Sequence, residues 1–187
     1  SFGGGSMLAA LALPRLLEKL SDRTAMLGGI GVMVVGLFAG VFVVGHASLM
    51  VLWFVLGLAY STAQTPSGRL LQRSAHPEDR PALFAAQFAL SHACWLLFYP
   101  LAGWLGARFG MPVSFVVLGG AGALAAWVAS RVWPVQDPEV IEHNHADLPA
   151  GHAHMLGAVA SGDRVRHAHT FVLDDQHPHW PGKDSRT

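Results

Sequence analysis

Eight histidines in the last quarter of the sequence form four pairs in which one residue separates the two members. The pairs are His143 and His145, His152 and His154, His167 and His169, and His177 and His179. Residues i and i+2 of an extended chain lie on the same side, so each pair could chelate an ion, and two pairs could supply four nitrogens. Because imidazole is a good ligand for transition metals, we predict a nickel, zinc or cobalt site here. The rest of the sequence requires no cofactor.

The segment that carries these histidines, 135–187, differs sharply in composition from the residues before it. Acidic residues, proline and glycine replace apolar clusters, so we expect a mostly disordered tail with short order at 170–173. Asp147, Asp174 and Asp175 would act as oxygen ligands or as hydrogen-bond partners of the imidazoles. The alternative is a solvated, histidine-biased tail that selects no ligand, because such tracts indicate metal binding by composition alone.

A second group of polar residues lies within strongly apolar stretches upstream. Polar side chains are costly in lipid, so they normally face a bundle interior or a water-filled path. Imidazole changes charge between about pH 5 and 8, which suits a proton relay. We therefore predict that these residues line a wet, functional path, with interhelical hydrogen bonding as the alternative. They are Tyr60, Gln64, Gln87, His92 and Tyr99.

The apolar stretches themselves predict an all-α integral membrane protein. Hydrophobic residues make up 52% of the sequence and charged residues only 13%, and no Asp, Glu, Lys or Arg occurs from 25 to 68. A membrane helix needs about 20 apolar residues. We expect a membrane domain over 1–134 with five spans, the first of them partial, at about 2–17, 25–46, 48–65, 81–107 and 112–133. Two spans contain small-residue patterns that allow close helix approach, Gly36-x-x-x-Gly40 and Gly119-x-x-x-Ala123.

Basic residues collect in alternate connections between these spans. They are Arg15, Lys19 and Arg23 after the first span, Arg69, Arg73 and Arg80 after the third, and Arg131 at the end of the fifth. Such residues mark cytoplasmic loops. We therefore expect these connections and the tail to lie in the cytoplasm, most simply at the inner membrane of a bacterium.

Several functional classes are disfavoured by the sequence. Cys94 is the only cysteine, so neither an internal disulfide nor a cysteine-based zinc site can form. The formal net charge of zero argues against nucleic-acid binding. The spans contain no paired carboxylates and the chain has no phosphate-binding loop, so we do not expect an enzyme.

Two stretches resemble the major facilitator superfamily of transporters. Asp22 and Arg23 match the acid–base pair of the family's cytoplasmic loop motif, Gly-x-x-x-Asp-Arg-x-Gly-Arg, while Glu18 and Ala25 replace its two glycines. The stretch 99–110 looks like the family's eleventh span running into a short outer loop. This resemblance implies that 1–134 correspond to spans eight to twelve, the C-terminal half of the family's helical bundle.

The resemblance also implies a function, transport of a small solute by alternating access between two six-helix halves. This chain would supply one wall of the path, and the missing N-terminal half would supply the other. We expect proton-coupled efflux of, or regulated by, a divalent transition metal, because the histidine-rich tail is similar to those of some nickel- and cobalt-exporting members. Transport of an organic solute with a metal-sensing tail, or a non-transporting membrane anchor for such a tail, remain alternatives.

Overall fold

The computed structural model describes residues 1–17, 20–135, 140–144, 159–161, 164–174, 177 and 180. The chain divides into two compact units. The first contains 1–71 and 82–135, and the second contains 72–81 and 136–187. The helices are α1 (Phe2–Leu17), α2 (Asp22–Ala39), the short 3-10 helix η1 (Gly40–Phe42), α3 (His46–Arg73), α4 (Arg80–Phe109) and α5 (Met111–Val132).

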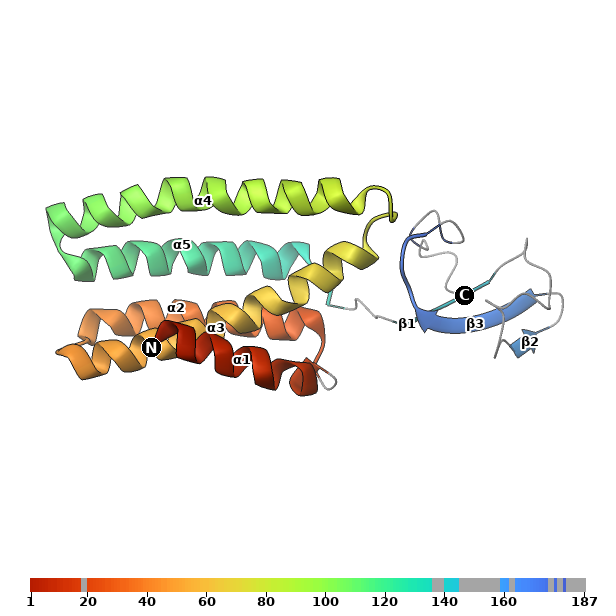
Figure 1. Cartoon of the computed structure of the whole chain (residues 1–187), viewed down its shortest axis with the longest axis horizontal. Coiled ribbons are helices and arrows are strands. Elements are labelled where there is room, and N and C mark those ends of the chain that lie inside the picture. The colour runs from red at the N-terminus through yellow and green to blue at the C-terminus, as the bar shows by residue number, and fades with distance from the viewer. Residues whose placement is uncertain are drawn as a thin grey trace. The chain divides into compact units, whose positions relative to one another are not determined.

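The first unit confirms the predicted all-α membrane fold, with its helices running side by side along their long axes (Figure 1). Within the described residues, four segments are long and apolar enough to cross a bilayer: α2 together with η1, α3, α4 and α5. The apolar part of α1, Phe2–Leu13, is shorter.

The third helix continues past the point where its predicted span ends. The apolar stretch stops near Thr65, but α3 runs on through Pro66 to Arg73 and reaches 28 residues. At 1.5 Å per residue such a helix is about 42 Å long, more than the 30 Å of a hydrocarbon core. The last two turns of α3 can therefore lie outside the hydrocarbon layer, where polar residues no longer oppose helix formation.

Small residues allow the helices of the first unit to pack closely. On α3, the buried residues Leu52, Leu56, Ala59 and Ala63 recur at helical spacing and form one stripe. A Cβ added to Gly29 of α2 would lie 2.7 Å from the carbonyl oxygen of Ala59, so the two backbones are nearly in contact there.

The two predicted small-residue patterns also lie at helix contacts. A Cβ on Gly36 would meet Leu56 of α3 at 2.9 Å, and one on Gly40 would meet the ring of Phe115 at 2.7 Å. On α5, a Cβ on Gly119 would lie 3.3 Å from the ring of Phe38. These glycines therefore bring α2 and η1 against both α3 and α5.

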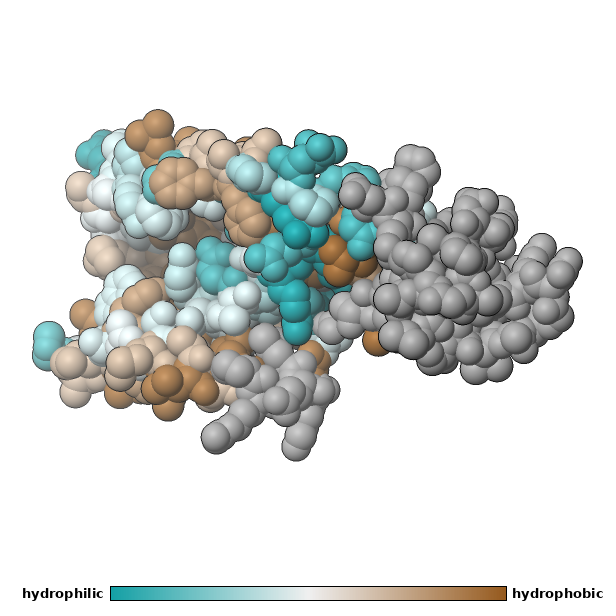
Figure 2. Space-filling model, turned by 45° about the vertical axis from the view of Figure 1, so that its right-hand side comes forward, coloured by the Kyte–Doolittle hydropathy of each residue, from teal (hydrophilic) through white to brown (hydrophobic). Residues whose placement is uncertain are grey.

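Much of the outer surface of this unit is apolar. Leu105 is the one buried residue of the 30-residue helix α4, while Leu96 of the same helix is 79% exposed. Figure 2 shows brown, hydrophobic surface over the helices and hydrophilic residues gathered toward one end. An apolar exterior of this extent suits contact with lipid tails rather than water.

The second unit contains a small antiparallel sheet that the sequence did not lead us to expect. Strands β1 (Val140–Asn144), β2 (Val159–Ser161) and β3 (Arg164–Thr170) pair in the order β1-β3-β2. The strands are short and carry few apolar residues, so their pattern is too weak to predict them. Order in the tail therefore extends beyond the predicted 170–173.

Candidate functional site

Tyr60 and Gln64 of α3 lie on one face, as their spacing of four residues predicts. The amide Nε2 of Gln64 is 3.4 Å from the hydroxyl oxygen of Tyr60, one turn earlier. The ring of Phe2 packs against Tyr60 with centroids 5.8 Å apart, which places α1 beside this face. Tyr60 is half-buried and Gln64 is exposed, so the amide remains accessible at the surface of the unit.

A contact between α3 and α4 extends this polar group. The amide Nε2 of Gln87 lies 3.4 Å from Oγ of Ser67, and that hydroxyl donates to the carbonyl oxygen of Gln64 over 2.6 Å. Gln64, Ser67 and Gln87 thus form one cluster across two helices. Sequence analysis did not single out Ser67, because it lies beyond the predicted end of the third span. Its position three residues after Gln64 was the available signal.

Along α4, four rings form a continuous stripe on the exposed side of the helix. The centroids of Phe88 and His92 are 3.8 Å apart, those of His92 and Trp95 are 4.7 Å apart, and those of Trp95 and Tyr99 are 6.0 Å apart. The spacing of three and four residues between His92, Trp95 and Tyr99 therefore places their rings in sequence along one face. An aromatic stripe of this kind can hold a cation or a flat apolar surface against the ring faces.

The hydrogen bond of His92 identifies which ring nitrogen can accept a proton. Nδ1 lies 2.8 Å from the carbonyl oxygen of Phe88, one turn earlier. A carbonyl only accepts, so Nδ1 carries the hydrogen, and Nε2 is the basic nitrogen of the neutral ring.

The structure brings the predicted pathway residues together in two groups. Tyr60, Gln64 and Gln87 belong to the α3–α4 cluster, while His92 and Tyr99 belong to the aromatic stripe of α4. Among the residues that the structure describes, no hydrogen bond links the stripe to that cluster. The two groups are therefore separate features of the same helix pair.

At the end of the unit where α2 begins, the two residues of the loop motif have different partners. Asp22, which is 5% exposed, accepts hydrogen bonds from Nε and Nη2 of Arg69 on α3. Arg23 donates instead to the carbonyl oxygens of Ser130 and Trp133, at 3.0 and 3.3 Å. Both carbonyl groups lie at the C-terminus of α5, where a positive charge complements the helix dipole.

These two interactions join three helix ends. The start of α2 is linked to the end of α3 through Asp22 and to the end of α5 through Arg23. The sequence motif identified Asp22 and Arg23 but not their partners. Arg69 lies 47 residues from Asp22, and Ser130 and Trp133 lie 107 and 110 residues from Arg23. The only sequence signal for Arg69 was its place among the basic residues of a single loop.

In the second unit, the last turn of α3 packs against a short tail segment. Phe171 is 2% exposed, and its ring contacts those of His177 and Trp180 at centroid distances of 5.0 and 4.9 Å. The guanidinium carbon of Arg73 lies 5.7 Å from the centre of the Trp180 ring, and the N–H of Leu173 donates to the Arg73 carbonyl over 3.1 Å. This segment of the tail thus contacts Arg73, the last residue of α3.

The predicted metal ligands fall into three groups. His177 is 4% exposed, with Nδ1 2.8 Å from Oδ1 of Asp174, so it forms part of the packed cluster around Phe171. His143 lies on β1, and His167 and His169 lie on β3. The remaining four, His145, His152, His154 and His179, fall outside the described residues.

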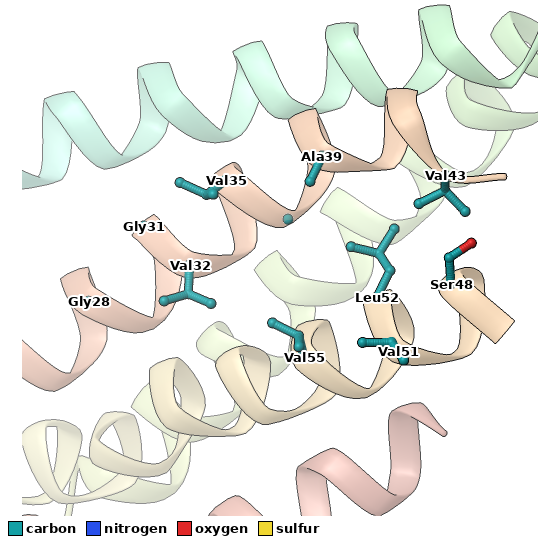
Figure 3. A pocket seen from close by; sticks show the side chains of 11 residues that line it. Gly28, Gly31, Val32, Val35, Ala39, Val43, Ser48, Val51, Leu52 and Val55 are labelled. Carbon is teal, nitrogen blue, oxygen red and sulfur yellow. The ribbon is translucent and has the colours of Figure 1, made fainter.

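A cleft of about 630 Å³ lies between α2 and α3 (Figure 3). Its lining is apolar, with side chains such as Val32, Val35 and Val55 pointing into it from the two helices, and Ser48 is its single hydroxyl. None of the predicted pathway residues contributes to it. A cleft with a single hydroxyl has too few polar groups to orient a polar solute, so it is not a candidate transport site.

Comparison with known proteins agrees with this architecture. A family model described as Major Facilitator Superfamily matches residues 1–170. The probable galactarate/D-glucarate transporter GudP of Bacillus subtilis (strain 168) is 30% identical over 116 residues, which cover 60% of this chain and 26% of that protein. The match thus spans about a quarter of the relative's length. No solved structure matches.

The family model matches most of the chain, and the chain has apolar spanning helices, two of which carry a polar face. The chain is therefore a multi-pass integral membrane protein that belongs to the major facilitator superfamily, a family of solute transporters rather than enzymes.

Proposed function

We propose that the chain forms one wall of a proton-coupled efflux transporter for a small solute, with a tail that makes transport responsive to a divalent transition metal. The observation that carries the proposal is the concentration of neutral polar groups on α3 and α4. Tyr60, Gln64 and Gln87 form a cluster there. By contrast, α2 contributes mainly glycine and valine to its cleft with α3. Polar groups of this kind within a membrane mark a solute path.

Proton coupling is assigned to His92. Its Nδ1 donates to the carbonyl oxygen of Phe88, which leaves Nε2 as the nitrogen that would accept the proton. No Asp or Glu occurs in 80–134 to compete as a proton acceptor on α4 or α5. Binding of solute and proton to the same helix pair would allow each to influence the other's affinity.

The solute that this wall suits is rich in hydroxyl groups or other neutral polar groups. The side chains of the cluster are amides and hydroxyls, which donate and accept hydrogen bonds without carrying charge. GudP is named for two sugar diacids. A diacid would bring two negative charges, and 81–107 contains no Lys or Arg to pair with them. A cation for such a substrate would have to come from elsewhere in the transporter.

The proposed orientation places the ends of α3 and α5, and the tail, in the cytoplasm. Arg23 and Arg69 lie at one end of the first unit, together with the C-terminus of α5. Basic residues are retained on the cytoplasmic side of a membrane. This orientation suits an inner membrane of a bacterium, and it would expose the histidines to the metal ions of the cell interior.

Everted membrane vesicles from cells that produce the protein test this function. Their cytoplasmic face is outward, so an efflux protein accumulates its solute inside when the lumen is acidified. We expect accumulation of nickel(II) or D-glucarate above that of vesicles without the protein, and its loss when an ionophore collapses the proton gradient. Accumulation that persists without the gradient would contradict proton coupling. Accumulation of neither probe, in a protein that still binds metal, would favour the membrane-anchor alternative.

A further inference from the structure

The last residue of α3 is capped and covered by the tail segment 171–180. The backbone N–H of Leu173 donates to the Arg73 carbonyl oxygen over 3.1 Å. The last four carbonyl groups of a helix lack a hydrogen-bond partner within that helix, so this bond caps the C-terminus of α3. The guanidinium of Arg73 lies over the ring of Trp180, and Arg73 is only 6% exposed. The side chain of Arg69, one turn earlier, is far more exposed.

The tail segment is itself organised around the ring of Phe171. This ring is almost fully buried and meets those of His177 and Trp180 edge to face. Oδ1 of Asp174 accepts a hydrogen bond from the backbone N–H of His177 over 2.9 Å and lies 2.8 Å from Nδ1 of the same residue. The position of Trp180 over Arg73 therefore depends on the packing of Phe171 and His177.

The capped residue lies one helical turn from the pair that joins α2 to α3. Arg69 and Arg73 are four residues apart on α3, and Arg69 holds Asp22. Helix termini fray readily, because their last backbone groups have few hydrogen bonds within the helix. Loss of the tail contact should therefore loosen the last turn of α3, and with it the backbone that positions Arg69.

We infer that the segment 171–180 is an intramolecular latch on the end of α3, and that a divalent transition metal ion bound by His177 opens it. In the closed latch His177 is 4% exposed and its Nδ1 is engaged with Asp174, so an ion with its other ligands cannot reach the ring. A ligand that binds only one of two conformations shifts the population toward that conformation. The inference rests on the metal-responsive role proposed above and gives it a mechanism, because an ion of the class of zinc, nickel or cobalt would free the end of α3.

The two states of the latch are linked reciprocally to metal binding. If an ion binds only to the open latch, the closed latch must weaken ion binding by the same factor. A substitution that loosens the latch should therefore lower the ion concentration that opens it, even at Phe171, whose side chain cannot ligate a metal. A tail whose histidines bind metal independently of α3 would not show this dependence.

Hydrogen exchange of the whole purified chain in detergent micelles, followed by mass spectrometry, tests the latch in metal-free buffer. Phe171→Ala should speed exchange of the amides of 70–73 about tenfold, because the last turn of α3 then opens more often. Val140→Ala, at an exposed tail residue, is the control and should leave that rate unchanged. Equally slow exchange of the α5 amides in all variants would verify that the membrane helices are intact. An unchanged rate at 70–73 in Phe171→Ala would overturn the latch.

Nickel(II) chloride tests the regulation in the same assay. It should speed exchange at 70–73 in the unmodified chain, whereas magnesium, which prefers oxygen ligands, should not. His177→Phe keeps an aromatic ring beside Phe171 but has no ligand nitrogen, so its latch should stay closed in nickel(II). Phe171→Leu, which loosens the packing without removing a ligand, should open at a nickel(II) concentration about threefold lower than the unmodified chain.

The outcomes separate the latch from the proposed transport function. No nickel effect in the unmodified chain, or an equal effect in His177→Phe, would overturn the regulation by metal. The exchange rates require no transport measurement, so a chain that moves no solute could still show the latch. Conversely, a chain that transports its solute but shows the same exchange in every variant would retain the proposed function and lose the latch.

Discussion

The guanidinium of Arg69 holds the carboxylate of Asp22 with two hydrogen bonds, one from Nε to Oδ2 at 3.2 Å and one from Nη2 to Oδ1. The carboxylate is almost fully buried, whereas 44% of the arginine side chain is exposed. Removal of one partner therefore has a different energetic cost for the carboxylate than for the guanidinium. A buried carboxylate without its partner keeps its desolvation cost, while a half-exposed guanidinium can be hydrated by water.

This asymmetry predicts an order of stability among substitutions. Arg69→Ala should destabilise the protein by about 1–3 kcal/mol, because it leaves a charged group buried without its main partner. Adding Asp22→Asn to that variant should restore part of the loss, since the neutral amide costs less to bury. Thermal unfolding in detergent, followed by intrinsic tryptophan fluorescence, measures both effects. Arg108→Ala at the exposed end of α4 is the control. A double variant less stable than Arg69→Ala would contradict this account.

Two adjacent glycines of α2 provide a test of the helix packing. A Cβ on Gly29 would lie 2.7 Å from a carbonyl oxygen of α3, whereas a Cβ on Gly28 would have nothing within 4 Å. Gly29→Ala should therefore push the helices apart and lower the melting temperature. Gly28→Ala should be neutral or stabilising by up to about 1 kcal/mol, because alanine favours a helix. Similar melting temperatures for the two variants would mean that α2 and α3 do not pack as described.

Transport should depend on the polar residues of α3 and α4 more than on the apolar residues that α2 contributes to the cleft. We expect Gln64→Leu and His92→Leu each to reduce solute accumulation in everted vesicles at least fivefold. Val35→Ala, on an exposed part of α2, should retain most of the activity. Quantitative immunoblotting should confirm equal amounts of protein in the membrane. If all three variants transport equally well, the cluster and the stripe lie outside the solute path.

The proposed orientation can be tested by cysteine labelling. Cys94 is exposed, so Cys94→Ala must first remove the native thiol. In that background, Ser74→Cys and Ser161→Cys should react with a membrane-impermeant maleimide only after the cells are opened, because both lie in the predicted cytoplasmic parts. His46→Cys, at the opposite end of α3, should react in intact cells. The reverse pattern would mean that the bundle is inserted the other way round.

The sequence predicted the helices well because apolar length and charge depletion are local properties. It was less informative about where α3 ends, since a span is limited by the hydrocarbon layer but a helix is not. The partners of Asp22 and Arg23 depend on how three helices are rotated and aligned against one another. No local pattern encodes that arrangement.

The candidate sites also show that local patterns can be predicted from the sequence, whereas contacts between distant segments cannot. Tyr60 and Gln64 share a helix face, as do His92 and Tyr99, because helix periodicity determines which residues of one helix lie together. The pairing of His143 with His167 depends instead on strand register, which is set by connections between distant segments. Repeated histidine spacing could suggest chelating pairs but not which pairs meet.

The contact between α2 and α5 has a consequence for how the protein is made. Arg23, Gly40 and Phe38 of the α2 region all find partners near or within α5, which begins 72 residues after α2 ends, from Ala39 to Met111. At ribosomal rates of about 5–20 residues per second, α5 would emerge roughly 4–14 s after α2. During that interval the glycine-rich face of α2 has no native partner on that side. Nascent α2 should therefore depend on the insertion machinery or on membrane chaperones to avoid premature pairing with other helices.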